Sequence, residues 1–266
     1  MAQKIERIPT YIDGIDEEIE GGVPKGFVNL VRGVSGTMKS SVIFNIIYNE
    51  ALKGKSSFYV SIEQSFDNLA QHLNNLGMDL SKINIALVRT DSTKMEPINK
   101  AQKSKGTIIF LDIPSIRQKI VRASKYGDLI TLITNMIGTL AKTLKYDYFV
   151  LDSLNAIYAI SDIKKPRETL FNIFEFLRVQ KLTSYLILED CLNEESYGEY
   201  GIEDYLADSV IALSLARYDR IVQREIIVRK MRATKSNTNV FTFSFKNGKF
   251  IATEGGRIPV LDFNER

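Results

Sequence analysis

A glycine-rich stretch near the N-terminus carries residue types that bind phosphate. Residues 33–41 read GVSGTMKSS and lie between an apolar run at 27–31 and a segment of helical period. A strand, a glycine-rich turn and a helix together aim backbone N–H groups and a helix N-terminus at one anion. In such a loop a lysine supplies charge for the terminal phosphates, and the next hydroxyl can ligate Mg²⁺. We therefore predict a nucleotide phosphate site made of Val34, Ser35, Gly36, Thr37, Met38, Lys39, Ser40 and Ser41, with Ser40 as a metal ligand.

One position departs from the usual loop pattern G-x-x-x-x-G-K-[ST]. The residue before Lys39 is Met38, where the pattern has its second glycine. A residue with a Cβ lacks the conformational latitude of glycine and adds bulk beside the phosphates. Gly36 remains in the loop. We expect it to preserve most of the curvature.

Two further polar pairs follow apolar runs that are typical of buried strands. Glu63-Gln64 comes after residues 56–62, and Asp152-Ser153 comes after residues 146–151. Ligands of open α/β sheets bind at the carboxyl ends of the strands. Asp152 is the candidate acid that holds Mg²⁺ opposite Ser40, and Glu63 is the candidate general base or water-orienting residue. The alternative for Glu63 is a solvent-facing carboxylate at a strand end.

Two cations near the C-terminus allow two interpretations. Lys230 and Arg232 alternate along a predicted strand, so they lie on one face. They are either charges on a solvated strand edge or residues that reach the γ-phosphate of an adjacent subunit. His72 is expected on a helix surface, because it has no ligand partner at a suitable spacing. Cys191 has no neighbouring histidine motif, and we assign it no catalytic role.

The order of predicted elements indicates an α/β fold. Strands and helices alternate through the first two thirds of the chain, and hairpin-like segments follow Ala207, with Asn247-Gly248 as one turn. This order predicts a mainly parallel twisted sheet flanked by helices, with an antiparallel C-terminal extension. The length suits one domain over residues 1–266. We expect 90–125 to be an insertion or a mobile loop region, in which 107–111 is a strand of the insertion or a return to the sheet.

Composition narrows the class of protein. The net charge of +3 is too small to predict nucleic-acid binding, and a single cysteine excludes an internal disulfide. We find neither an apolar run of membrane-spanning length nor a signal-like apolar segment at the start. These features favour a cytoplasmic globular protein.

These motifs, in this order, resemble the KaiC-like branch of the RecA superfamily of ATPases. The resemblance is carried by residues 8–10, 14–17 and 21–26 before the loop, and then by 33–41, 61–65, 151–153, 200–210 and 230–232. It implies a RecA-like P-loop core that binds ATP and Mg²⁺. It also implies hexameric rings with nucleotide between subunits, in which Lys230 and Arg232 act across the boundary. A single domain of this length is similar to the archaeal members.

Two departures from the family pattern leave the activity open. Besides Met38, the second acid of the family's Glu-Glu pair is Gln64, which keeps a group able to orient water. We expect ATP binding with slow hydrolysis, in which Glu63, Gln64, Lys39, Lys230 and Arg232 take part. One alternative is a nucleotide-sensing scaffold that docks a protein partner without appreciable turnover. Another is a DNA-binding, recombinase-like module, which rests on the fold and on the lysines between residues 94 and 105.

Overall fold

A single large sheet organises the part of the chain that the structure describes. This computed structural model describes residues 5–89, 106–116, 129–143, 146–160, 165–190 and 200–255. The strands of the sheet, from one edge to the other, are β2 (Ile12–Asp13), β13 (Lys249–Glu254), β12 (Phe241–Lys246), β11 (Ile221–Met231), β10 (Ser209–Tyr218), β4 (Val28–Gly33), β9 (Thr183–Glu189), β8 (Tyr148–Asp152), β5 (Ser57–Ser61), β7 (Thr107–Asp112) and β6 (Asn84–Val88). A separate small pair joins β1 (Arg7–Ile8) to β3 (Val23–Pro24).

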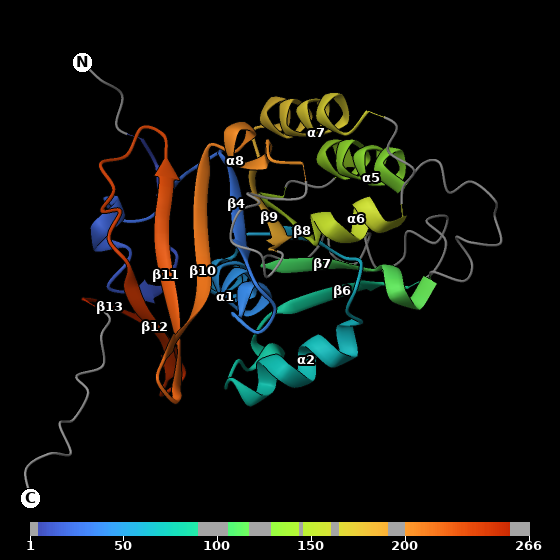
Figure 1. The fold of residues 1–266 in the computed structure, drawn as a ribbon. Coiled ribbons are helices and arrows are strands. Elements are labelled where there is room, and N and C mark those ends of the chain that lie inside the picture. Colours follow the sequence, from blue (N-terminus) through green and yellow to red (C-terminus); the bar gives the residue numbers. More distant parts are fainter. Residues whose placement is uncertain are drawn as a thin grey trace, which may run out of the picture.

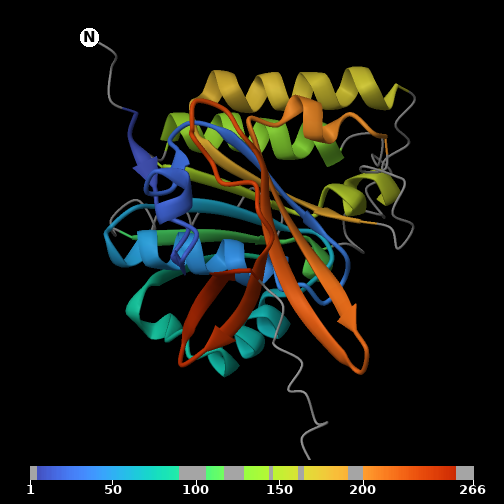
Figure 2. The ribbon, with the colours of Figure 1, turned by 60° about the vertical axis from the view of Figure 1, so that its left-hand side comes forward.

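The sheet has a parallel part and an antiparallel part. Strands β10, β4, β9, β8, β5, β7 and β6 run parallel to one another, and β10 to β13 form successive antiparallel pairs. The turn between β12 and β13 is at Asn247-Gly248. In Figure 2 the long orange β10–β11 pair comes to the front of the molecule. The predicted fold class is therefore confirmed.

Helices cover both faces of the parallel strands (Figure 1). Helices α1 (Lys39–Leu52) and α2 (Phe66–Asn75) lie on one face, and α5 (Leu129–Thr143), α6 (Leu154–Ile160) and α7 (Pro166–Gln180) lie on the other. The short α8 (Glu203–Leu206) precedes β10, and 3₁₀ turns occupy Glu17–Ile19 and Leu80–Lys82.

Two hydrophobic clusters result, one on each face of the sheet. Phe58 and Val60 of β5 belong to the cluster under α5, α6 and α7, whereas Tyr59 belongs to the cluster under α1 and α2. Successive side chains of a strand point to opposite faces, and here both faces are buried. The apolar runs in the sequence reflect this double burial.

The structure refines several expected elements. Residues 107–112 form β7, which pairs with β5 and β6, so this segment returns to the main sheet. Residues 90–105 and 117–125 of the expected insertion lie outside the described residues, as do Cys191 and the lysines between 94 and 105. The short helices α6 and α8 were not predicted.

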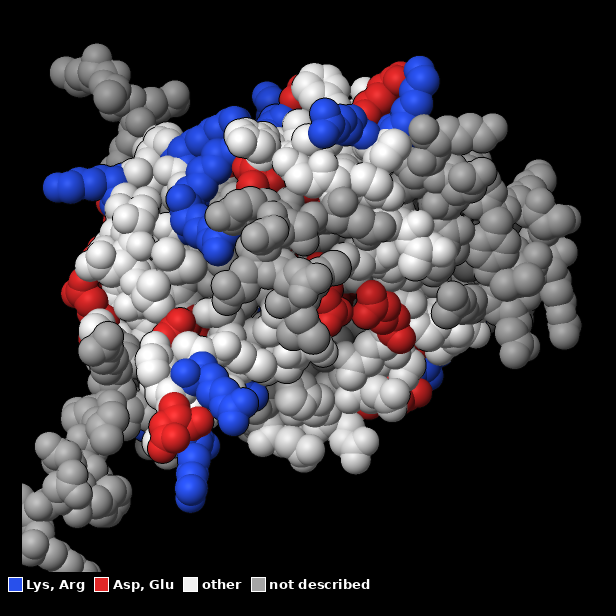
Figure 3. Space-filling model, in the orientation of Figure 1, with Lys and Arg blue, Asp and Glu red and all other residues white. Residues whose placement is uncertain are grey.

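Charge on the face drawn in Figure 3 is mixed. Lys and Arg side chains are interspersed there with Asp and Glu side chains, in keeping with the small net charge. Among the described residues, none of the helices is both long and apolar enough to span a membrane.

Candidate functional site

The predicted phosphate loop connects β4 to α1. Strand β4 ends at Gly33 and α1 begins at Lys39. A Cβ at Gly33 would lie 2.1 Å from the carbonyl oxygen of Leu213 in the neighbouring β10, so only glycine fits there. The buried Thr37 closes the loop, because its Oγ1 donates to the carbonyl oxygen of Val34 at 2.8 Å.

Met38 adopts the backbone conformation that glycine favours. Its φ of 72° and ψ of 25° are left-handed, at the position just before α1. For a residue with a Cβ this conformation costs about 1–2 kcal/mol. The loop thus keeps its left-handed bend without the usual glycine, at the expense of local strain.

Lys39 lies at the base of a cavity of about 460 Å³. Its Nζ donates to the carbonyl oxygens of Gly33, at 2.8 Å, and Val34, at 3.0 Å. Burial lowers the pKa of this lysine, and the nearby carboxylates of Glu189 and Asp152 oppose that shift. A phosphate in the cavity would meet a buried ammonium group, whose field is screened little by water.

An acidic group lines one side of the cavity. Asp152, at the end of β8, accepts a hydrogen bond from the Tyr59 hydroxyl at 2.6 Å. Burial raises the pKa of Asp152, while hydrogen bonds from Tyr59 and Ser40 lower it. Ser40 and Asp152, the two predicted metal ligands, therefore lie next to each other.

Glu63 and Gln64 follow β5 on the same side. Glu63 Oε1 accepts a hydrogen bond from Ser153 Oγ at 2.7 Å, and Ser61 Oγ donates to the carbonyl oxygen of Gln64 at 2.6 Å. Both Glu63 and Gln64 line the cavity. Glu63 is an exposed residue, so water can reach it.

The donor set fits a hard cation such as Mg²⁺. A hydroxyl and a carboxylate provide oxygen ligands, and Mg²⁺ in nucleotide sites usually keeps several waters and takes further oxygens from phosphates. Among the described residues, no group of three or more His, Cys, Asp or Glu side chains could hold a metal without help. With Ser40 and Asp152 as ligands, the remaining positions around such a cation would be filled by waters and phosphate oxygens.

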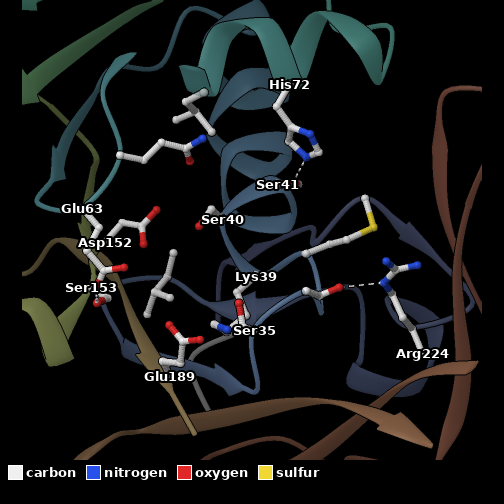
Figure 4. Close-up of a pocket in the computed structure, with 15 residues that line it drawn as sticks. Ser35, Lys39, Ser40, Ser41, Glu63, His72, Asp152, Ser153, Glu189 and Arg224 are labelled. Atoms are coloured by element: carbon white, nitrogen blue, oxygen red, sulfur yellow. Dashed lines mark hydrogen bonds between the residues drawn. The ribbon is translucent and has the colours of Figure 1, made fainter. Parts of the chain in front are cut away.

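The opposite side of the cavity has different residues. Figure 4 shows His72 and Arg224 across Lys39 and Ser40 from Glu63 and Asp152. His72 Nε2 lies 2.9 Å from Ser41 Oγ, and Arg224 Nε donates to the carbonyl oxygen of Gly36 at 3.0 Å.

The structure brings most of the predicted residues together. Ser35, Gly36, Met38, Lys39, Ser40, Ser41, Glu63, Gln64 and Asp152 all line the cavity. Val34 and Thr37 of the predicted loop lie outside this lining and support it from behind.

Lys230 and Arg232 lie away from the cavity of their own chain. Lys230 Nζ donates to the carbonyl oxygens of Asp204, Tyr205 and Ala207, at 2.9, 3.1 and 2.6 Å. Arg232 forms an ion pair with Asp208 at 2.8 Å. Burial lowers the pKa of Lys230, and the neighbouring Arg232 adds to this shift.

Sequence reasoning missed three ionisable residues of the cavity: Glu189, Arg224 and His72. Glu189 ends a buried strand, the same signal that identified Asp152. His72 was expected on a helix surface and is exposed there, but its spacing of three from Leu69 places both on the cavity side of α2. Arg224 had no such signal, because 188 residues separate it from Gly36.

Comparison with known proteins finds relatives of two kinds, namely longer circadian clock proteins and archaeal proteins that this chain covers over most of their length. Circadian clock protein KaiC3 of Synechocystis is 27% identical over 252 residues, which cover 93% of this chain and 45% of that protein. This chain therefore spans less than half the length of that relative. A UPF0273 protein of Pyrococcus furiosus is 25% identical over 262 residues, which cover 97% of this chain and 95% of that protein.

A solved structure agrees with the fold. The crystal structure of a KaiC-like protein from Pyrococcus horikoshii matches with a TM-score of 0.71 and 23% sequence identity, covering 94% of this chain and 99% of that one. The family described as "ATPase: KaiC" matches residues 8–254. The resemblance predicted from the motifs is confirmed, and the chain belongs to the KaiC family of ATPases.

Proposed function

We propose that this chain binds ATP with Mg²⁺ in the cavity and hydrolyses it slowly, as a nucleotide-dependent switch in an oligomer. One observation carries the proposal: the loop after β4, Glu63 after β5 and Asp152 after β8 line a single cavity. These three features lie far apart in the sequence, and a nucleotide-hydrolysing site needs all of them. Membership of a family of ATPases supports the same conclusion.

In this proposal the loop binds the phosphates. Backbone N–H groups around Gly36 and the start of α1 meet the phosphate oxygens, and Lys39 exchanges its carbonyl partners for phosphate. Ser40 and Asp152 would hold Mg²⁺, which when bound neutralises charge on the β- and γ-phosphates.

Glu63 is the proposed base for hydrolysis. Its carboxylate accepts a proton from a water molecule whose oxygen forms a bond to the γ-phosphorus. The bond between the γ-phosphorus and the bridging oxygen breaks, and ADP leaves with that electron pair. Ser153 holds one oxygen of Glu63 and so orients the carboxylate. Gln64, which lines the same cavity, can help to orient the water.

The test is steady-state phosphate release by purified protein with saturating ATP and Mg²⁺. Glu63→Gln removes the base and should lower the rate at least about 100-fold. Glu168→Gln is the matched control, since Glu168 is an exposed residue of α7 whose ion pair with Lys165 is also exposed. It should hydrolyse ATP like the wild type. Equal rates for wild type and Glu63→Gln would remove Glu63 from this role.

A second candidate is an ATP-binding scaffold with negligible turnover. The left-handed Met38 and the amide at Gln64 favour it, since both replace residues of a fast hydrolase with less suitable ones. Calorimetry that finds ATP binding at micromolar strength, together with no phosphate released over hours, would decide for the scaffold.

We also propose that active oligomers are rings with nucleotide between subunits, in which Lys230 and Arg232 act on the neighbour's nucleotide. In support, neither side chain lines the cavity of its own chain. Lys230 lies on β11, whereas Arg232 lies in the turn just after that strand, so the expected alternation along one strand does not hold for Arg232. Arg232 is half exposed, with 52% of its side chain accessible, so another chain can reach it.

A further inference from the structure

The cavity has two chemically different ends. Glu63 and Asp152 line one end, where the terminal phosphate must lie if hydrolysis is to occur, and Lys39 and Ser40 occupy the middle. The phosphate chain therefore runs from the acidic end past Lys39 toward Ser41. The nucleoside must extend beyond Ser41, toward the residues at the other end.

His72 is the polar side chain of α2 at that other end. Its Nε2 makes a hydrogen bond with Ser41 Oγ at 2.9 Å, which links the α2 helix to the first turn of α1. Leu69, one turn earlier on α2, also lines the cavity and is almost fully buried. An apolar side chain and an imidazole together suit a sugar joined to its first phosphate, which presents both apolar C–H groups and hydrogen-bonding oxygens.

We propose that His72 is a nucleotide-positioning residue that contacts the α-phosphate and sugar of a nucleotide bound to its own chain. This inference rests on the proposed function of the cavity and assigns its nucleoside end. The imidazole shares its hydrogen bond between Ser41 and the ligand and faces the sugar. Tight binding therefore depends on the nucleoside half of ATP, because His72 contacts that half.

The test compares ATP with inorganic tripolyphosphate, which has the phosphates without the nucleoside. His72→Ala should weaken ATP binding about tenfold by calorimetry, the equivalent of one hydrogen bond to a charged group. Tripolyphosphate binding should change less than about twofold, since its contacts lie at Lys39 and the loop. Gln71→Ala is the matched control on the exposed surface of α2, and it should leave the affinity for both ligands unchanged. His72→Gln, which keeps a nitrogen at similar reach, should recover part of the ATP affinity.

A second measurement does not depend on variants. His72 is the only histidine of the sequence, so ¹³C-labelled histidine gives one imidazole signal in the full chain. ATP and ADP should shift that signal strongly, and tripolyphosphate should shift it little.

Each remaining outcome contradicts the inference. If His72→Ala loses affinity for ATP and for tripolyphosphate by the same factor, His72 acts only on the phosphate loop. Unchanged ATP affinity, or a histidine signal that ATP leaves in place, would remove His72 from the site. Wild-type protein that binds no ATP at all would overturn the proposed function itself, which the other results leave standing.

Discussion

Met38 shows how the loop keeps its shape after losing a glycine. Its left-handed backbone is held between the buried Thr37 and the first turn of α1, and its side chain packs at the margin of the core beneath α1. The surrounding structure therefore supplies the energy that the strained residue costs. If ATP binds as proposed, a strained residue lies beside its phosphates, and this gives a physical reason for the slow turnover proposed above.

Two substitutions at Met38 separate strain from bulk. Met38→Ala shortens the side chain but keeps the Cβ, whereas Met38→Gly removes both. The unfolding free energy of Met38→Gly should exceed that of Met38→Ala by about 1 kcal/mol, because only glycine relieves the left-handed strain. Met38→Gly should also hydrolyse ATP faster than the wild type. Denaturant titration and phosphate release measure these effects, and identical stabilities for the two variants would show that no strain is stored there.

Tyr59 holds the candidate metal ligand Asp152. It is fully buried, its ring stacks on Phe110 at 4.9 Å, and its hydroxyl donates to Asp152. A residue that orients a ligand from behind contributes to metal affinity although it does not touch the metal.

Tyr59→Phe should raise the Mg²⁺ concentration needed for ATP binding about tenfold, because it removes only the hydroxyl that orients Asp152. ATP affinity measured over a range of Mg²⁺ concentrations checks this. Tyr185→Phe is the control, because Tyr185 is also fully buried and its hydroxyl has no hydrogen-bond partner among the described residues. If both variants respond alike, the effect comes from packing and not from Asp152.

At the scale of elements, sequence patterns predicted the features that depend on neighbouring residues along the chain, and they missed those that depend on packing between distant elements. Asp152 and Glu63 were identified because a buried strand reads as an apolar run and ends where ligands bind. His72 and Arg224 were not identified, since the packing of α2 and β11 against the loop brings them there. Helix α6 was missed because its seven residues, Leu154–Ile160, are too few to show a helical period.

Glu50 joins three elements behind the site. It is a buried residue of α1, and its carboxylate accepts hydrogen bonds from Tyr11 of the N-terminal segment and from Tyr148 of β8. Burial alone would raise the pKa of Glu50, but the hydrogen bonds from these tyrosines and Lys53 outweigh it and hold the pKa below the ordinary value of a glutamate. The lowered value means that the folded state prefers the ionised carboxylate.

The stabilisation by Glu50 should therefore be present above the pKa of the unfolded chain and be lost as pH falls through the lower, folded value. Glu50→Gln should lower the unfolding free energy by about 1–3 kcal/mol at neutral pH, because it replaces a buried acceptor. The difference from wild type should shrink in acid. Denaturant titrations at several pH values measure it, with the exposed Glu17→Gln as control. A difference that stays constant with pH would assign the effect to packing.

At the scale of the whole molecule, the separation of Lys230 and Arg232 from the cavity predicts complementation between chains. Lys39→Ala should inactivate the site of its own chain, and Arg232→Ala should inactivate the site of a neighbour. Mixed and reassembled, the two variants should recover about a quarter of wild-type hydrolysis, since random neighbours pair two intact halves that often. Light scattering should show a mass that is a multiple of 30.2 kDa when ATP and Mg²⁺ are present. No recovery from a mixture that does assemble would show that Arg232 acts within its own chain or not at all.

The most direct test of the account is calorimetric titration of the wild-type chain and of Lys39→Ala with ATP in the presence of Mg²⁺. Binding to the loop after β4 predicts one saturable site per chain in the wild type. It also predicts at least about tenfold weaker binding in Lys39→Ala, which lacks the buried ammonium group. Saturable binding of equal strength in both proteins would place the nucleotide elsewhere, and no binding by the wild type would contradict the proposal that this loop, with methionine at position 38, still binds ATP.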